Sequence, residues 1–339
     1  MKFLLVTLNG KFSQGLYPWD SMDIHALAEE FQKHDCHVDF QECDQLLQCK
    51  DSLKKYDAIV FGSSQIPYEK KILEDYAFIT NLLGSNIIPR YELVLSHDNK
   101  GMQGLLAIAK GIDVIHFEYG TDANADYKPG YVYKTIDGAG SFGVSLPKSD
   151  NELRQFIKKN TLLREQPLRL WHYIKQKLKL FIWRKRYIKE KEQYFRPGIP
   201  LVSQKLIPNL KFDYKVLVFH DLFFVLKRNV RKNDFRASGS GLFEKVAQVP
   251  SQVLDLANRY CKELDSPCLS IDVAFDGSKA FCIEFQCCHF GPITYLDADV
   301  VHYRTKDTWT SNIWHRKSLE WVFAYSICNN MKFKKKPTQ

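Results

Sequence analysis

The order of apolar segments in residues 1–97 is the feature that most constrains how this chain folds. Residues 2–8 (KFLLVTL) and 56–64 (YDAIVFGSS) contain short continuous apolar runs, which are typical of strands covered on both faces. Between these runs, residues 21–35 carry apolar side chains at helical spacing, and residues 36–43 (CHVDFQEC) predict a further strand. Strands that alternate with helices predict an open, mostly parallel sheet whose ligand-binding edge lies at the carboxyl ends of the strands.

The pattern changes after residue 97. Residues 130–146 predict two strands joined by a glycine-rich loop. Residues 214–228 and 269–286 each predict a β-hairpin, since each holds two apolar strands around a short polar turn. Helices are predicted from about residue 99, after an N-cap at Ser149 or Asp150, at residues 249–264 and at residues 316–330.

The positive charge of the chain is concentrated in one segment. The formal net charge is +9, and residues 164–191 hold ten Lys or Arg against two Glu. Such an excess favours polyanionic partners, namely nucleotide phosphates, nucleic acid or an anionic membrane surface. A solvated basic face has the same composition, so charge alone does not choose between these interpretations.

The cysteines and the first residues bear on the cellular location. Nine cysteines, an odd number, are scattered along the chain, and the apolar run at residues 3–6 is too short for the core of a signal peptide. The sequence has no apolar stretch of the roughly eighteen residues that a membrane span requires. Reduced thiols and a cytoplasmic location are therefore predicted.

The second hairpin carries a candidate metal site. Its turn at residues 276–279 would bring Asp272 beside Glu284 or Gln286, and the latter two lie on one face because they are two residues apart. Two carboxylates and an amide oxygen form a hard donor set that suits Mg²⁺ completed by substrate phosphates. Taken by itself, an acidic pair on a hairpin also occurs without any metal.

Two further segments suit phosphate binding. Lys134 ends a strand just before Gly138, Gly140 and Gly143, and glycines let a backbone approach phosphate oxygens closely. An ordinary glycine-rich turn gives the same pattern. Residues 226–241 contain several arginines, whose planar forks match phosphate or carboxylate, although a solvated basic loop is the alternative.

Taken together, these segments resemble the ATP-grasp enzymes, and in particular the glutamate ligases that modify a ribosomal protein. The resemblance covers residues 98–294 and depends on the order and spacing of Lys100, Lys134 with its glycine-rich loop, SQKLI (203–207), DYK (213–215), LKRNVRKNDFRASGSG (226–241), SIDVAF (270–275) and CIEFQ (282–286). It implies an α/β (α+β) class and an ATP-grasp fold. The implied domains are an open α/β domain at 1–97, a central subdomain at 98–200 with a basic helical insertion at 161–195, and a C-terminal subdomain at 201–339 with the metal site.

The resemblance also implies roles in binding ATP and Mg²⁺, with Mn²⁺ as a substitute. Nucleotide binding is implied for Lys100, Lys134, Gly138, Gly140, Ser141, Gly143, Gln204, Lys205, Leu206, Asp213 and Lys215. Within this set Lys100 and Lys134 would hold phosphates, the glycine-rich loop would cover the β- and γ-phosphates, and residues 204–206 would contact adenine mainly through their backbone. Arg228 and Arg236 would be catalytic and face the transferred phosphoryl group. Asp272, Glu284 and Gln286 would bind one or two Mg²⁺.

The implied activity is that of an ATP-dependent carboxylate–amine ligase, which forms an amide or peptide-like bond through an acyl-phosphate. A glycan precursor of the cell surface and a peptide are the substrate classes considered. Three departures from the family pattern keep a degenerate ATP-binding protein and a kinase of the same fold as alternatives. Gln286 stands where asparagine is usual, Lys215 where arginine is common, and residues 287–289 (CCH) where small residues and proline are common.

The CCH segment has three interpretations. Adjacent cysteines do not easily ligate one tetrahedral zinc, and no second CxxC or HxxxH lies nearby to complete the ligands. A nucleophilic thiol has no identifiable partner. Cys287, Cys288 and His289 are therefore expected to line the pocket of the second substrate.

The basic segment at residues 161–195 is an addition to the family pattern. Trp171, Ile174, Leu178 and Phe181 fall along one side of a predicted helix, with lysine and arginine on much of the rest. A basic amphipathic helix suits an anionic membrane surface, here through residues 168–190, and it equally suits packing on the protein itself or on a partner. A homodimer is a further expectation, and nucleic acid ranks lower because no aromatic and basic groove of a known module is found.

Overall fold

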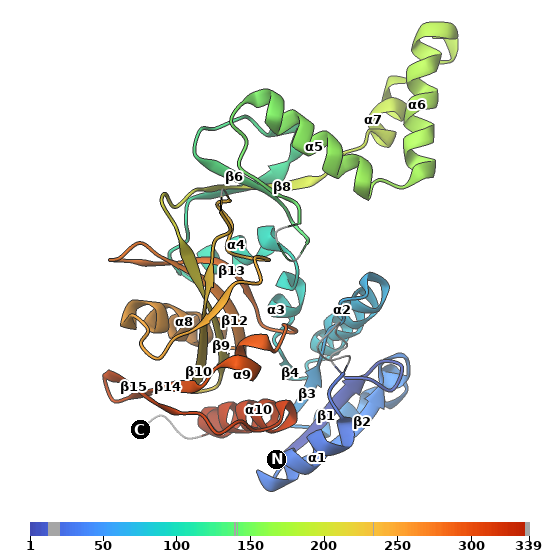
Figure 1. Cartoon of the computed structure of the whole chain (residues 1–339). Helices are drawn as coiled ribbons and strands as arrows, with labels where there is room; N and C mark the ends of the chain where they lie inside the picture. Colours follow the sequence, from blue (N-terminus) through green and yellow to red (C-terminus); the bar gives the residue numbers. More distant parts are fainter. Residues whose placement is uncertain (13–20, 139, 141, 233, 336–339) are drawn as a thin grey trace. The chain divides into compact units, whose positions relative to one another are not determined.

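The computed structural model describes residues 1–12, 21–138, 140, 142–232 and 234–335, and it divides into two compact units (Figure 1). Unit 1 consists of Met1–Val114 and Asn209–Gln339, and unit 2 consists of Ile115–Pro208. Most of the first and last predicted domains, 1–97 and 201–339, thus falls in one compact unit. Their separation as domains stays a prediction.

Unit 1 begins with a parallel sheet of four strands in the order β2-β1-β3-β4. The strands are β1 (Lys2–Thr7), β2 (His37–Glu42), β3 (Ala58–Phe61) and β4 (Ile87–Ile88), and the segments between them are α1 (Ile24–Lys33), the 3-10 helix η1 (Cys43–Lys55) and α2 (Pro67–Leu82). Phe3 and Leu5 pack into one hydrophobic cluster, whereas Leu4 and Val6 pack into another. Both faces of β1 are therefore covered, which explains its continuous apolar run.

Two short helices, α3 (Tyr91–Ser96) and α4 (Lys100–Ala109), follow β4, and α4 contacts β13 of a second sheet in unit 1. The second sheet is antiparallel and has seven strands in the order β13-β12-β9-β10-β14-β15, with β11 paired to β10. Its strands are β9 (Phe212–Phe219), β10 (Leu222–Asn229), β11 (Phe243–Lys245), β12 (Cys268–Phe275), β13 (Ala280–Gln286), β14 (Val300–Thr305) and β15 (Thr308–Ile313). Both predicted hairpins, β9–β10 and β12–β13, are confirmed.

Helices cover both faces of the antiparallel sheet, as Figure 1 shows. They are α8 (Ser251–Leu264), α9 (Ile293–Asp297) and α10 (Leu319–Lys335). Val216 and Val218 of β9 share a core cluster with α8, whereas Leu217 and Phe219 share another with α9 and α10. The alternation of β9 side chains therefore separates its two faces. Asp213 and Lys215 continue the row of Leu217 and Phe219, on the face opposite α8.

Unit 2 holds an antiparallel sheet in the order β5-β8-β6-β7. Its elements are β5 (Phe117–Thr121), η2 (Asp122–Asn124), β6 (Tyr131–Thr135), β7 (Val144–Ser145), α5 (Asp150–Arg164), α6 (Pro167–Ile182), η3 (Arg184–Arg186), α7 (Lys189–Phe195) and β8 (Pro200–Lys205). The side chain of Ser149 accepts a hydrogen bond from the backbone N–H of Glu152, so the predicted N-cap of α5 is confirmed. Leu153 of α5 packs against Tyr133 and Leu201 of the sheet.

Candidate active site

A row of charged side chains crosses neighbouring strands of the seven-stranded sheet in unit 1. Glu284 on β13 pairs with Asp272 on β12, and Asp272 pairs on its other side with Lys215 on β9. Two residues before Lys215, Asp213 pairs with Arg228 on β10. Of the two partners predicted for Asp272, Glu284 and Gln286, Glu284 is the one opposite it, and a β-bulge between Asp272 and Val273 gives this register. The register thus gathers five of the expected site residues.

Ion pairs join the middle of this row. Nε and Nη2 of Arg228 donate to the two carboxylate oxygens of Asp213, each at 2.7 Å. Nη2 of Arg228 also lies 2.7 Å from Oδ2 of Asp272, and Nζ of Lys215 donates to Oδ1 of Asp272 at 2.8 Å. Asp213, Arg228 and Asp272 are all buried. One guanidinium therefore serves two buried carboxylates.

Burial and these neighbours act on the carboxyl groups in opposite directions. Burial by itself would raise the pKa of Asp272, but the charges of Arg228 and Lys215 outweigh it and hold that pKa well below its usual range. Burial raises the pKa of Asp213 to about 6 against the opposing hydrogen bonds from Arg228. Asp272 is therefore the firmly ionised member of the pair.

The end of the row near α4 carries two more expected residues. Lys100 is the first residue of α4, and its Nζ lies 3.4 Å from Oε1 of Glu284. Gln286 donates from Nε2 to Oδ1 of Asp98 at 3.1 Å, and Nζ of Lys70 lies 3.8 Å from the other oxygen of Asp98. Sequence reasoning missed Asp98 and Lys70. Their only sequence signal is the position of Asp98 directly before the capped helix.

The donor atoms of this cluster fit a magnesium ion that is completed by other ligands. Asp272, Glu284 and Gln286 supply oxygens, which Mg²⁺ prefers. Among the residues that the structure describes, however, no group of three or more His, Cys, Asp or Glu is arranged to hold a metal. The protein therefore does not supply a complete set of metal ligands. Asp272, Glu284 and Gln286 suit a Mg²⁺ ion whose other ligands are water molecules and phosphate oxygens.

The expected phosphate-binding hairpin lies in unit 2. Lys134 on β6 is buried, and its Nζ donates to Oε1 of Gln204 on β8 at 2.6 Å. Gly138, Gly140 and Gly143 all have positive φ, a conformation that side chains disfavour. At Gly143 a Cβ would also collide with Oγ1 of Thr135. Ser141, the remaining expected residue of this loop, lies outside the described residues.

An arginine of α5 braces this loop. Arg164 donates from Nη2 to Oγ1 of Thr135 at 3.0 Å and from Nε to Oδ1 of Asp137 at 3.1 Å. Its Nη1 donates to Oδ1 of Asn160 at 2.8 Å, which fixes the guanidinium on its own helix. Sequence reasoning missed Arg164 and Thr135, because nothing local in the sequence joins positions 29 residues apart.

The expected adenine-binding residues end β8. The backbone N–H of Lys205 donates to the carbonyl of His116, and the N–H of Leu206 donates to that of Gly130. Both N–H groups are thus already hydrogen-bonded inside unit 2. The predicted contacts of these two residues with adenine are thereby limited to their carbonyl oxygens and side chains.

Arg236, the second expected catalytic residue, lies in the loop after β10. Its Nε donates to Oδ1 of Asp234 at 2.9 Å, and its Nη2 donates to Oδ2 of the same carboxylate at 2.8 Å. Oδ1 of Asp234 also accepts a hydrogen bond from the backbone N–H of Arg236 at 3.0 Å. This compact turn holds the guanidinium close to its own backbone.

The CCH segment is buried directly after β13. Burial raises the pKa of Cys287 to about 12 and that of Cys288 well above its usual value, so both thiols stay protonated near neutral pH. Burial also lowers the pKa of His289 to about 3. These groups are therefore unsuited to act as nucleophile and base in this arrangement.

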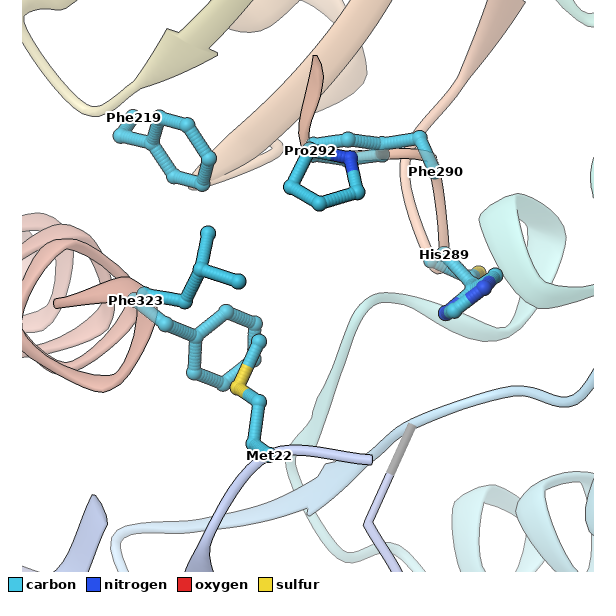
Figure 2. A pocket seen from close by; sticks show the side chains of 8 residues that line it. Met22, Phe219, His289, Phe290, Pro292 and Phe323 are labelled. Atoms are coloured by element: carbon cyan, nitrogen blue, oxygen red, sulfur yellow. The ribbon is translucent and has the colours of Figure 1, made fainter. Parts of the chain in front are cut away.

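Cys288 and His289 line a small cavity in unit 1. Figure 2 shows His289 on one side of this cavity, which Phe219, Phe290 and Phe323 also line. The cavity has a volume of about 30 Å³, which is room for about one water molecule. The role expected for this segment in holding a second substrate stays a prediction.

These observations define the class of protein. The two sheets of unit 1, the glycine-rich hairpin of unit 2 and the order of the charged residues belong to a mixed α/β chain, and solved structures that match it over most of their length have the ATP-grasp fold. The chain therefore has the ATP-grasp fold, as the sequence predicts.

Three solved structures illustrate the likeness, each with a TM-score of 0.52. The RimK-domain ATP-grasp protein of Sphaerobacter thermophilus is 10% identical, and the match covers 97% of this chain and 99% of that one. The macrocyclase MdnC of Microcystis aeruginosa, bound with precursor peptide MdnA, is 11% identical over 97% of this chain and 100% of that one. PurK, an N5-carboxyaminoimidazole ribonucleotide synthetase in complex with ADP, is 11% identical over 97% and 77%.

Comparisons by sequence give no match: no protein-family model and no curated protein resembles this chain closely enough to count. At such low identities the structural likeness establishes the fold alone.

Proposed function

We propose that this protein is an ATP-dependent carboxylate–amine ligase. The observation that carries the proposal is the row of the half-buried Glu284, the buried Asp272 and the half-buried Lys215 beside the buried Asp213–Arg228 pair. Burying a charged side chain in a sheet costs desolvation free energy. Clusters of buried charged residues are therefore common at sites that bind or transform a ligand.

The charge balance of this cluster suits a nucleotide. Three carboxylates and three cations, counting Lys100, hold one another in ion pairs. ATP with two Mg²⁺ is close to neutral, so its arrival would leave the total charge nearly unchanged. Lys100 and Lys215 would turn to phosphate oxygens while Asp272 and Glu284 turn to the metal. Bound Mg²⁺ would supply charge neutralisation at the phosphates, through Asp272, Glu284 and Gln286.

The roles of the remaining residues follow from their chemistry. Lys134 would hold nucleotide phosphates, with Gly138, Gly140 and Gly143 as the backbone around them. Gln204, Lys205 and Leu206 would contact adenine. Arg228 would keep Asp272 ionised, and Arg236 would face the phosphoryl group if Asp234 released it.

The proposed reaction has two steps. A carboxylate oxygen of the acid attacks the γ-phosphorus of ATP, the bond from that phosphorus to ADP breaks, and an acyl-phosphate forms. The amine then attacks the carbonyl carbon, gives up a proton, and displaces inorganic phosphate to leave an amide. The lysines and arginines of the site would offset the repulsion between the acid and the triphosphate.

The substrates belong to the same proposal. The neighbour MdnC is bound with a precursor peptide, which supports a peptide as one substrate class. A glycan precursor that carries an acid or an amine is the other class. We place the reaction in the cytoplasm, where reduced thiols are stable, and all nine cysteines are free. A homodimer is part of the proposal and is tested by measuring the mass of the protein in solution.

Hydroxylamine trapping tests the activity. Purified protein is incubated with ATP, Mg²⁺, hydroxylamine and a panel of amino acids, short peptides and uronic acids, and ADP and hydroxamate are both measured. A ligase gives ADP and hydroxamate together, and only with the correct acid. Asp272→Asn should abolish both products, whereas Asp299→Asn, which changes an exposed carboxylate paired with Lys245, should retain them.

The same assay separates the two alternatives. A kinase of this fold would release ADP with a hydroxyl substrate and never form hydroxamate. A degenerate ATP-binding protein would bind ATP and release no ADP above background with any acid or amine. Either outcome would overturn the ligase proposal.

A further inference from the structure

Helix α6 exposes an apolar stripe. Six of its large apolar side chains are exposed, from 41% at Ile174 to 76% at Phe181. The stripe consists of Leu168, Trp171, Ile174, Leu178, Phe181 and Ile182, which recur every three or four residues and so lie along one side of the helix. Apolar surface of this extent on a folded unit marks a site of interaction.

The opposite side of α6 is the one that packs inside unit 2. Nζ of Lys177 lies 2.6 Å from Oε1 of Glu192 on α7, and Nη2 of Arg169 donates to the carbonyl of Tyr194 at 3.1 Å. The ring of His172 stacks on Phe195 with centroids 4.8 Å apart. A surface helix usually buries its apolar face and exposes its polar one. In α6 the side that carries Arg169, His172 and Lys177 packs on α7, whereas the apolar stripe is exposed. Figure 1 shows α7 alongside α6.

Cations flank the stripe. Residues 167–191 contain nine Lys or Arg and a single Glu. Arg184, Lys185 and Arg186 form the exposed 3-10 helix η3 directly after α6, and Trp183 before them is 56% exposed. The apolar stripe thus ends in an aromatic and strongly basic tip.

We propose that the stripe of α6 and the basic tip at residues 183–186 form a binding surface for an anionic lipid bilayer. Helices that lie in a membrane interface carry Trp, Phe and Leu on one side and Lys and Arg beside them. Each cation near an anionic leaflet adds to the attraction, and tryptophan favours the interface itself. Within the described residues, no helix is long and apolar enough to cross a bilayer, so α6 would lie along the surface.

The chemistry of this surface favours lipid over the other occupants. A nucleic acid would leave the aliphatic side chains Leu168, Ile174 and Leu178 without an apolar partner. A second copy of this chain would bring the cations of two basic tips together, which costs free energy. This inference does not depend on the ligase proposal, because it involves different residues and its test needs no turnover.

Vesicle flotation tests the proposal with the full-length protein. Vesicles of phosphatidylcholine with about a third phosphatidylglycerol should carry the protein upward, and pure phosphatidylcholine should carry far less. Raising the salt from ~0.1 M to ~0.5 M should release most of the protein, since the Debye length shortens. Absence of flotation with anionic vesicles at low salt would overturn the proposal.

A matched pair of leucine variants tests the apolar stripe. Leu168 on α6 is 67% exposed and Leu82 on α2 is 68% exposed, so the two substitutions remove the same side chain at equal exposure. Leu168→Ser should lower the partition coefficient at least ~5-fold, because burying a leucine in lipid is favourable. Leu82→Ser should leave it unchanged. An equal loss in both variants would contradict the assignment of the stripe.

A second pair of variants tests the basic tip, and both variants change the net charge of the protein by the same amount. The triple variant Arg184→Glu, Lys185→Glu, Arg186→Glu should lower binding to anionic vesicles roughly 100-fold. The triple variant Lys50→Glu, Lys54→Glu, Lys55→Glu alters the total charge equally at exposed lysines of η1 and should change binding little. If the first triple still floats like the wild type, no anionic lipid is recognised here. If the wild type does not float and Leu168→Ser converts a dimer to a monomer, the occupant is a second copy.

Discussion

Nη2 of Arg228 lies 2.7 Å from Oδ2 of Asp272, and both side chains are buried in the sheet. The same guanidinium forms two hydrogen bonds with Asp213 on the neighbouring strand. A planar fork satisfies two carboxylates in a way that an ammonium group does not. The contribution of this charged cluster to the free energy of unfolding therefore depends on Arg228.

Arg228→Gln should be among the most destabilising substitutions at the site. It leaves two buried carboxylates without their shared cation, and breaking a buried pair costs about 3–5 kcal/mol of the free energy of unfolding. Arg228→Lys restores the charge without the fork and should cost less. Urea unfolding measures both, with Arg304→Gln as control. Arg304 lies 3.7 Å from Asp255 at the surface, so its loss should cost below about 1 kcal/mol.

Gln286→Ala should weaken magnesium binding. Loss of an oxygen ligand raises the Mg²⁺ concentration for half-saturation by roughly 10-fold. Titration of Mg²⁺ against ATP-dependent thermal stabilisation measures this without requiring turnover. Gln252→Ala removes an exposed amide at the start of α8 and serves as control. Equal Mg²⁺ dependence in Gln286→Ala and wild type would remove Gln286 from the ligand set.

Lys134→Met should weaken ATP binding while keeping the length of the side chain. Hydrogen bonds to charged groups contribute about 1.5–3 kcal/mol, so the Kd for ATP should rise ~10- to 100-fold. Lys128→Met is the matched control, because Lys128 pairs with Glu118 at the surface of the same sheet. Isothermal titration with a non-hydrolysable ATP analogue measures both. A Kd that rises equally in the two variants would indicate a general loss of cationic charge.

The sequence predicts the parts of the site that short-range geometry fixes. A four-residue turn sets the register of β12 and β13 as far as the pair Val273–Cys282, and a β-bulge between Asp272 and Val273 then brings Asp272 opposite Glu284, one of the two partners that the sequence left open. The pairing of Arg228 with Asp213 follows from the two-residue turn of the β9–β10 hairpin, whereas the contact of Arg228 with Asp272 could not be predicted in this way, because strand order decides that β12 and β10 flank β9. The brace from Arg164 to Thr135 likewise depends on where α5 packs.

The basic segment shows the same limit. Helical spacing predicts that α6 has an apolar side, but spacing does not say which side packs on α7. The contacts of Arg169, His172 and Lys177 with α7 show which side packs, and the apolar stripe is left exposed. The sequence therefore predicts the apolar stripe but does not predict whether the stripe packs against the protein or is exposed to bind a partner.

Gly143→Ala should disturb the glycine-rich loop more than Gly140→Ala does. Both residues have positive φ, near 70° and 61°, so either alanine would cost about 1–2 kcal/mol in backbone strain. A Cβ at Gly140 meets open space, whereas one at Gly143 collides with Thr135 and would push on the hydrogen bond from Arg164. Thermal unfolding and ATP affinity of both variants measure the difference. Equal losses of thermal stability and ATP affinity in the two variants would show that Thr135 moves to accommodate the new Cβ without disturbing the loop.

The buried histidines His97 and His289 should make the fold sensitive to acid. Their rings meet edge to face with centroids 6.2 Å apart. Burial lowers the pKa of His97 from 6.5 to about 4, and it lowers that of His289 from 6.5 to about 3. Above pH 6.5 both imidazoles are neutral in the folded and unfolded states, so neither makes stability depend on pH.

Below pH 6.5 the unfolded chain binds protons that the folded chain refuses, so the free energy of unfolding falls as the pH falls. Each histidine contributes a slope of ~1.4 kcal/mol per pH unit until its folded pKa is reached. His97→Gln should reduce the pH dependence of the free energy of unfolding between pH 6.5 and about 4. His289→Gln should reduce it between pH 6.5 and about 3. Urea unfolding at intervals of half a pH unit measures these slopes. A His97→Gln curve parallel to that of the wild type would mean that His97 is protonated in the folded protein, and that its burial does not hold it neutral.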